Sequence, residues 1–326
     1  MHMHARFAVL AALLVVLAVP FVGPPYATDL LFRTCLLAII SISWNMMAGA
    51  GLISLGHAAF WGVGAYAAIL TANRFGLGFL PSMLCATAAG CALGAVLALV
   101  TGRLKGIYFA ICTLALSEGL RVVALMLSDL TGGAQGQYLN AKLAPPVTYV
   151  DVAASAGALI AASIAWYVST TRYQYALRAM RANESAAQML GIRPLRYRVF
   201  IVVVSAGMAS FAGGASMWYA GYLDPDIAFA LHTTLIAQIA PILGGLYTLS
   251  GPLLGTIFAT VLGEGTRLWL AGNEGVTQFI YGLALVLCVI CLPQGFRGAI
   301  AQWSAKRRRR KARAVKAVEP VAGEVK

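Results

Sequence analysis

Long apolar runs separated by short polar or charged segments dominate this chain. A membrane-spanning helix needs roughly 20 mostly apolar residues, and ten stretches come close to that length. Their apolar positions are continuous, which favours helices over barrel strands, where apolar and polar residues alternate over about ten positions. The ten predicted spans are 7–22, 30–48, 52–72, 82–101, 107–127, 152–168, 199–220, 227–245, 249–270 and 276–292.

Composition supports the same conclusion. The 326 residues are 60% hydrophobic and 11% charged, with a mean hydropathy of +0.80, which excludes a soluble domain of ordinary composition. We therefore expect an all-α integral membrane protein of about ten transmembrane helices. Residues 1–296 are expected to form the transmembrane domain, and 297–326 a basic, disordered tail on the cytoplasmic side.

Orientation is predicted from the 24 basic residues, because cytoplasmic loops are rich in Lys and Arg. Six lie in 172–198 and ten follow residue 296. Together with Arg6, Arg103 and Lys105, these nineteen residues fall on the same side of the membrane when the ten spans are threaded. Six of the eleven acidic residues fall on the other. We expect a cytoplasmic C-terminus. The first run is expected to be a retained span and not a cleaved signal peptide, because no A-x-A-like site follows it.

Several catalytic signatures are missing from the sequence. A phosphate-binding loop of the type G-x-x-x-x-G-K-[ST] cannot occur without a Gly-Lys dipeptide, and the chain has none. Neither H-E-x-x-H nor G-x-S-x-G occurs. We therefore expect no ATPase activity of its own, no cofactor and no metal site. An ion-driven transporter is an alternative, with Glu118 and Glu264 as its ion-coupled carboxylates.

The segment 170–198 is the longest polar interruption expected to be ordered. Its apolar side chains recur at helical spacing and leave Arg178 and Arg181 off the apolar face, which predicts a short amphipathic helix. These apolar positions are Tyr173, Ala176, Leu177 and Met180. A second helix is predicted from a cap at Asn183 to Gly191. Periodicity alone fits a docking platform and a solvated loop equally well.

The letters ALRAMRANESAAQMLGI in this segment resemble the cytoplasmic coupling segment of binding-protein-dependent ABC permeases, whose core is E-A-A-x-x-x-G. Ala186, Ala187 and Gly191 match that spacing, whereas Ser185 stands at the acidic position and Glu184 lies one place earlier. The shifted arrangement is similar to the branch that imports branched-chain amino acids, the LivH/LivM permease family.

Other segments carry the same resemblance over about residues 30–295. They are SLGHAAFWGVGAY, GIYFAICTLALSEG, LTGGAQG and GGLYTLSGPLLG. Their order and position favour the LivM-like subunit over its LivH-like partner. Two positions depart from the family pattern, because Leu52 stands where the family often has Gln and Tyr247 where it often has Gly.

The resemblance implies a fold, partners and a substrate class. It implies the vitamin-B12-type (type II-like) importer architecture in a bacterial inner membrane, with a LivH-like permease, two ABC ATPase subunits and a periplasmic binding protein. The implied substrates are hydrophobic amino acids. Membrane lipid is the other implied contact, and no nucleic acid is expected. The alternative is an importer of urea, amides or aromatic acids from the same branch. The expected ATPase-coupling residues are Arg178, Arg181, Glu184, Ala186, Ala187 and Gly191.

Polar residues inside the third predicted span are candidates for the translocation path. Ser54, His57 and Trp61 are spaced i, i+3 and i+7, which places them on one stripe of a continuous helix. Ionisable residues in a membrane usually face the bundle interior or a wet cavity. A buried, hydrogen-bonded His57 is the alternative. The glycines of this span, including Gly62, are expected to allow close helix packing.

The fifth predicted span holds a second group of path candidates, Thr113, Ser117 and Glu118. An ionised group near the bilayer centre costs about 3 kcal/mol on insertion scales, so Glu118 must be paired, neutral or wet. Arg121 follows at i+3 and can pair with it. The same spacing predicts a pair of Glu264 with Arg267 in the ninth span.

Overall fold

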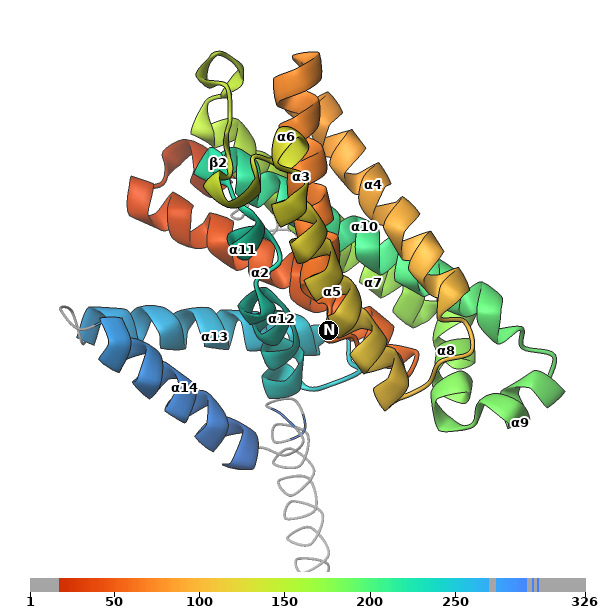
Figure 1. Ribbon diagram of the computed structural model, residues 1–326. Helices are drawn as coiled ribbons and strands as arrows, with labels where there is room; N and C mark the ends of the chain where they lie inside the picture. The colour runs from red at the N-terminus through yellow and green to blue at the C-terminus, as the bar shows by residue number, and fades with distance from the viewer. Residues whose placement is uncertain (1–17, 270–273, 292–294, 296–297, 299–326) are drawn as a thin grey trace, which may run out of the picture.

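The computed structural model describes residues 18–269, 274–291, 295 and 298, and most of them are helical (Figure 1). The long helices are α2 (Pro25–Gly49), α3 (His57–Phe75), α4 (Phe79–Val100), α5 (Ile107–Met126), α7 (Val147–Thr170), α10 (Pro194–Ala220), α12 (Leu231–Gly244), α13 (Ser250–Trp269) and α14 (Glu274–Cys291). The shorter elements are α6 (Ser128–Thr131), α8 (Arg172–Ala182), α9 (Glu184–Met189), α11 (Pro225–Ala228), η1 (Gly133–Gln135), η2 (Ala141–Leu143), β1 (Gln137–Tyr138) and β2 (Tyr222–Leu223).

Six stretches of the described chain are long and apolar enough to cross a membrane. They are α2, α4, α5, α7, α10 and Pro225–Gly244, which contains α11 and α12, and each coincides with a predicted span. Helices α3, α13 and α14 lie in three more predicted spans but fall outside those six. The first predicted span lies mostly outside the described residues, as does the basic tail. The described residues are thus predominantly helical, as in a multi-pass membrane protein of the all-α class.

Helix α10 forms the centre of the bundle, where it contacts α4, α3, α2 and α7 (Figure 1). Small residues make these close contacts possible. A Cβ atom on Gly64 would overlap the backbone of Ser210 in α10, and on another side of α3 one on Gly62 would overlap the ring of Phe229, which follows α11. Helices in lipid associate mainly through such close van der Waals packing. The prediction that the glycines of the third span serve packing is therefore confirmed.

The third span is shorter than predicted, because residues 52–56 are not helical and α3 begins only at His57. Ser54 therefore lies in the connection that precedes the helix, and the predicted helical stripe of Ser54, His57 and Trp61 is wrong at its first member. The hydrophobic pattern did not indicate the start of α3, because residues 52–56 are apolar enough to continue a helix.

The connection at residues 52–56 is held by side chains of neighbouring helices. The amide of Leu55 donates to Thr113 Oγ1 at 3.0 Å, and Trp44 Nε1 donates to the carbonyl of Ser54 at 2.8 Å. A Cβ on Gly56 would overlap the carbonyl group of Thr113, so the two backbones pack directly. Buried backbone groups need such partners where no helix supplies them.

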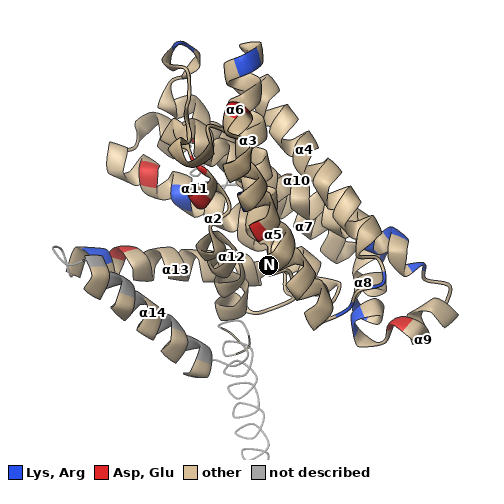
Figure 2. Ribbon diagram, in the orientation of Figure 1, with Lys and Arg blue, Asp and Glu red and all other residues tan. Residues whose placement is uncertain are grey.

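Charged residues gather at two ends of the bundle (Figure 2). Basic residues surround α8 and α9 at one end, whereas acidic residues occur at α6 and α11 at the other. At the second end the segments 129–151 and 221–226 join through a small antiparallel sheet, in which Gln137 pairs with Leu223 and Tyr138 with Tyr222. Residues far apart in sequence thus form one cap over that end.

Candidate functional site

Helix α8 carries the first group of predicted coupling residues. Ala176, Leu177 and Met180 are buried against the bundle, whereas Arg178 and Arg181 are exposed. The predicted amphipathic helix is therefore confirmed, and its two arginines point away from the packed face. Neither guanidinium group is buried in the contact between α8 and the bundle.

Helix α9 begins and ends as its sequence predicts. The side chain of Asn183 caps it by accepting a hydrogen bond from the amide of Ala186 at 3.1 Å. After the helix, Gly191 adopts a left-handed φ of +82°, and the amide of Ile192 donates to the carbonyl of Ala187 at 3.1 Å. Such a turn favours glycine. Ala187 is buried and Ala186 exposed, so the alanine pair spans the edge of the packed face.

Glu184 is not free for a partner, because it forms two ion pairs within the chain. Its Oε2 atom lies 2.8 Å from Lys105 Nζ and 2.8 Å from Arg198 Nη2. The side chains of Glu184 and Arg198 are only 12% and 7% exposed. Arg198 also donates to the carbonyl of Gly102 at 2.6 Å. Glu184 therefore ties α9 to α10 and to the α4–α5 connection, which no sequence spacing indicates.

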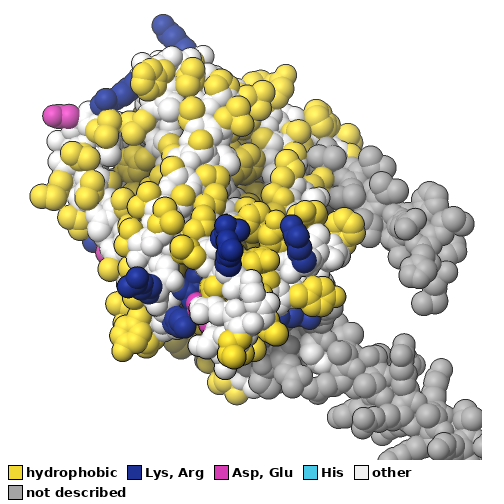
Figure 3. Space-filling view, turned by 90° about the vertical axis from the view of Figure 1, so that its right-hand side faces the viewer, with side chains coloured by type: hydrophobic (Ala, Val, Ile, Leu, Met, Phe, Trp, Pro, Cys, Tyr) yellow, Lys and Arg dark blue, Asp and Glu magenta, His cyan; other side chains and the backbone are white. Residues whose placement is uncertain are grey.

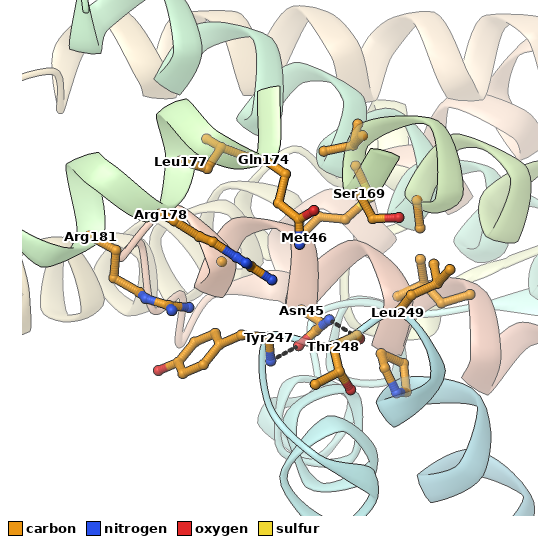
Figure 4. A pocket seen from close by; sticks show the side chains of 15 residues that line it. Asn45, Met46, Ser169, Gln174, Leu177, Arg178, Arg181, Tyr247, Thr248 and Leu249 are labelled. Carbon is orange, nitrogen blue, oxygen red and sulfur yellow. Dashed lines mark hydrogen bonds between the residues drawn. The ribbon is translucent and has the colours of Figure 1, made fainter. Parts of the chain in front are cut away.

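A cavity of about 70 Å³ opens between α2, α7, α8 and the connection that leads into α13 (Figure 4). Its lining includes Arg178, Arg181 and Gln174 from α8, and Asn45 and Met46 from α2. Figure 4 shows both arginine side chains reaching from α8 toward the α12–α13 connection. Two of the predicted coupling residues thus share one cavity.

Tyr247 lines this cavity and contacts both α8 and α2. The guanidinium carbon of Arg181 lies 3.8 Å from the centre of the Tyr247 ring, a cation–π geometry. Asn45 accepts a hydrogen bond from the amide of Tyr247 at 2.9 Å and donates to the carbonyl of Thr248 at 3.1 Å (Figure 4). Tyr247 is the only non-glycine residue of the described chain with a positive φ, +61°. A positive φ of this size favours glycine over tyrosine.

His57 is fully buried and contacts α2. Its Nε2 atom lies 2.7 Å from Ser43 Oγ. The Ser43 hydroxyl donates to the carbonyl of Ile40 at 2.8 Å, so we infer that the Nε2–H of a neutral imidazole donates to Ser43. The ring also packs edge-on against Phe60. These contacts fit the buried, hydrogen-bonded alternative, and a path-lining role stays a prediction.

The other predicted path residues differ in their access to solvent. Ser54, Thr113 and Ser117 are buried, and Trp61 is half-buried with its backbone against Gly213. The Glu118 side chain is 47% exposed. Of the six candidates, Glu118 thus carries the only ionisable group that reaches the surface of the bundle.

Both predicted intrahelical ion pairs are confirmed. Arg121 Nε lies 2.9 Å from Glu118 Oε2, and Arg267 Nη2 lies 3.0 Å from Glu264 Oε2. Arg121 also binds Asp226 Oδ1 at 2.9 Å, which connects α5 to α11. Sequence analysis missed this third member, because Asp226 lies 105 positions away.

Comparison with protein families identifies the chain. The model of the family described as "Branched-chain amino acid transport system / permease component" matches residues 26–289. The chain belongs to this family. The resemblance to the LivH/LivM permease family is thereby confirmed, and the chain is an ABC permease component, a transport subunit that is not an enzyme. A permease of this kind works with ATPase and binding-protein partners.

Individual relatives agree with the family match. The permease is 26% identical to the high-affinity branched-chain amino acid transport system permease protein LivM of Salmonella typhimurium, over 88% of this chain and 73% of the relative. It is 26% identical to LivM of Escherichia coli, over 87% and 73%. A probable LivH protein of Methanocaldococcus jannaschii is 30% identical over 39% of this chain and 41% of that protein. No solved structure matches.

Proposed function

We propose that this permease is the LivM-like subunit of an importer that moves hydrophobic amino acids, chiefly leucine, isoleucine and valine, across a bacterial inner membrane. It would pair with a LivH-like permease in a vitamin-B12-type architecture, with two ATPase subunits on the cytoplasmic side and a periplasmic binding protein opposite. The similarity to LivM proteins over most of the chain supports the substrate class.

The observation that carries this proposal is the pair of exposed arginines on α8. Arg178 and Arg181 project from a capped, amphipathic segment in the family's coupling position, and none of the ion pairs in the described chain involves them. Exposed guanidinium groups suit recognition of carboxylates on a partner. In this proposal they dock the ATPase, whereas Glu184, Ala187 and Gly191 shape the segment that presents them.

The charged cluster on α5 supports a translocation path along that helix. Glu118, Arg121 and Asp226 pair with one another, yet Glu118 remains about half exposed on the isolated chain. Charged groups in a membrane rarely face lipid; they face protein or a water-filled cavity. We therefore propose that this side of α5 faces the partner permease and the path between the two, which alternate in access.

The ion-driven alternative is less well supported. It requires Glu118 and Glu264 to bind and release a coupling ion, but each carboxylate already pairs with an arginine one turn away. A paired carboxylate would have to give up that arginine in every cycle. The importers of urea, amides or aromatic acids in the same branch differ from our proposal only in substrate.

The cap of joined segments at the acidic end is the proposed contact for the binding protein. Asp224 accepts a hydrogen bond from the amide of Ile227 at 2.7 Å and so caps α11, while Asp226 holds Arg121. These roles stiffen the loop that the binding protein would meet. Asp129 neither caps α11 nor holds Arg121, so its charge can be removed without loosening this loop. Neutralising it is expected to slow uptake at low ionic strength, because the charge would steer the binding protein toward the cap.

A co-purification experiment tests the proposal. The permease would be expressed with its partner permease and ATPase subunits, as wild type and as Arg178→Glu/Arg181→Glu. We expect the variant to insert normally and to lose the ATPase subunits. Lys142→Glu, a charge reversal at the opposite end, is the control. Full ATPase recovery with the double variant would contradict the docking role, and uptake that persists without ATPase but stops with an uncoupler would favour the ion-driven alternative.

A further inference from the structure

A second cavity, of about 430 Å³, lies where α8, the α9–α10 connection and the first turns of α10 meet. It is separate from the cavity of Arg181 and Tyr247. Three arginines and three aromatic residues line it: Arg172, Arg193, Arg196, Tyr173, Tyr197 and Phe200. Gly191, which is a predicted coupling residue, completes the lining, whereas the six charged and aromatic residues are neither predicted coupling nor predicted path residues.

The three arginines lack negative partners within the described chain. Arg172, Arg193 and Arg196 are exposed, and none of the six ion pairs found there includes them. Their neighbour Arg198 is different, because it is buried and paired with Glu184. Three unpaired guanidinium groups around one cavity favour a ligand with several negative oxygens, and arginine binds phosphate in a bidentate manner.

Aromatic side chains form the other wall and indicate the depth in the membrane. Tyr173 stacks on Phe200 with ring centres 4.6 Å apart and meets Tyr197 edge-on at 5.9 Å. Beside them, at the end of α7, Trp166 is 60% exposed and Tyr167 54% exposed. Tyr and Trp gather where a membrane-spanning helix reaches the headgroup region.

We propose that this cavity binds the phosphate of an anionic phospholipid headgroup. The arginines would hold the phosphate, and the acyl chains would extend along α7. Tyr167 follows exposed Ile160 by seven positions, so both lie on the same face of that helix. Figure 3 shows basic side chains gathered low on this side of the molecule, below a surface of mainly hydrophobic side chains. A bound headgroup would join α8 to α10 and so orient the coupling segment.

The competing occupant is the ATPase, but the geometry favours lipid. Arg172 and Arg181 are nine residues apart on α8, which places them on opposite faces at roughly 100° per residue. Arg193 immediately precedes α10 without capping it, and Arg196 lies in the first turn of that span, beside the aromatic wall. The apolar tip of α9, with Met189 and Leu190 exposed, is a separate surface that the ATPase could cover.

The test measures lipid binding to the purified full-length permease. Wild type and Arg193→Gln/Arg196→Gln would be titrated with phosphatidylglycerol and with phosphatidylcholine, and bound lipid counted by native mass spectrometry. Each basic residue near an anionic membrane surface contributes about 1 kcal/mol, so losing two weakens binding about 30-fold. We expect a loss of that size for phosphatidylglycerol and little change for phosphatidylcholine.

Two controls keep the result specific. Arg178→Gln/Arg181→Gln removes the same charge from α8 outside this cavity and is expected to retain phosphatidylglycerol. Tyr197→Leu keeps every charge and is expected to bind phosphatidylglycerol more weakly, because the aromatic wall is incomplete. Equal losses in both arginine double variants, or no loss in either, would overturn the proposal. It would also be overturned if inorganic phosphate or the ATPase subunits, rather than lipid, required Arg193 and Arg196 for binding.

Discussion

The two groups of residues that sequence analysis assigned to function lie in opposite environments. Around the start of α3, Ser54, His57 and Thr113 are buried, and their hydrogen bonds join the connection and α3 to helices α2 and α5. On α8, Arg178 and Arg181 are exposed and lack an acidic partner among the described residues. A polar residue inside an apolar run can therefore support an irregular backbone, whereas a polar residue on an amphipathic helix remains available for binding.

Glu184 shows that residues close together in the sequence can differ in burial. It lies three positions from Arg181, yet it is mostly buried between Lys105 and Arg198. Replacing Arg181 therefore tests a partner contact, but replacing Glu184 tests the stability of the segment itself. Variants of the buried residues are therefore expected to lower stability, whereas variants of the exposed arginines are expected to weaken partner binding.

The largest effect is expected at the start of α3. Gly56→Ala places a methyl group on the backbone carbonyl of Thr113, which cannot rotate away as a side chain could. Overpacking of this kind costs about 3 kcal/mol or more, so little folded protein is expected by size-exclusion chromatography. Gly119→Ala is the control, because nothing lies near its Cβ position. Normal folding of Gly56→Ala would mean that the connection is mobile and not clamped.

The next largest effect is expected at Glu184. Glu184→Gln leaves the buried guanidinium of Arg198 without its counter-charge. Breaking a largely buried pair on one side costs about 3 kcal/mol when the remaining charge cannot reach water, and thermal unfolding in detergent would report it. Glu118→Gln breaks a more exposed pair and is expected to cost under about 1 kcal/mol. Similar losses in the two variants would remove the distinction between the two environments.

A smaller effect is expected from the contact between His57 and Ser43. Ser43→Ala leaves the imidazole N–H without its acceptor in a buried site, which costs about 1–2 kcal/mol. If His57 is scaffold, the losses of Ser43→Ala and His57→Ala are expected to overlap in the double variant. Uptake per folded molecule is expected to stay near the wild-type value. A selective loss of uptake with unchanged stability would instead assign His57 to the path.

The smallest effect is expected at Tyr247. Tyr247→Gly removes a left-handed backbone cost of about 1 kcal/mol and also the cation–π contact with Arg181, worth about 0.5–1 kcal/mol, so the two changes nearly cancel. Tyr247→Ala loses the ring and keeps the backbone cost, and is expected to unfold more easily than the glycine variant. Equal melting temperatures for the two variants would show that φ at this position costs nothing.

The sequence predicted most helices because their physical causes are local. Six predicted spans coincide with helices that can cross a membrane, and α9 begins at the cap of Asn183 and ends before the left-handed Gly191. The start of α3 was misplaced because its cause is not local. Residues 52–56 leave the helical conformation where Thr113 and Trp44 supply hydrogen bonds from other helices.

The sequence by itself determined the class of protein, the two short helices of 170–198 and the family, because hydropathy, helical periodicity and short motifs depend on neighbouring residues. Only the tertiary structure decided which polar residues are free. Asp226 meets Arg121, and Glu184 meets Lys105 and Arg198, through pairings that join separate helices. A charge is available for binding only where no other helix brings it a partner, and that depends on how the helices pack.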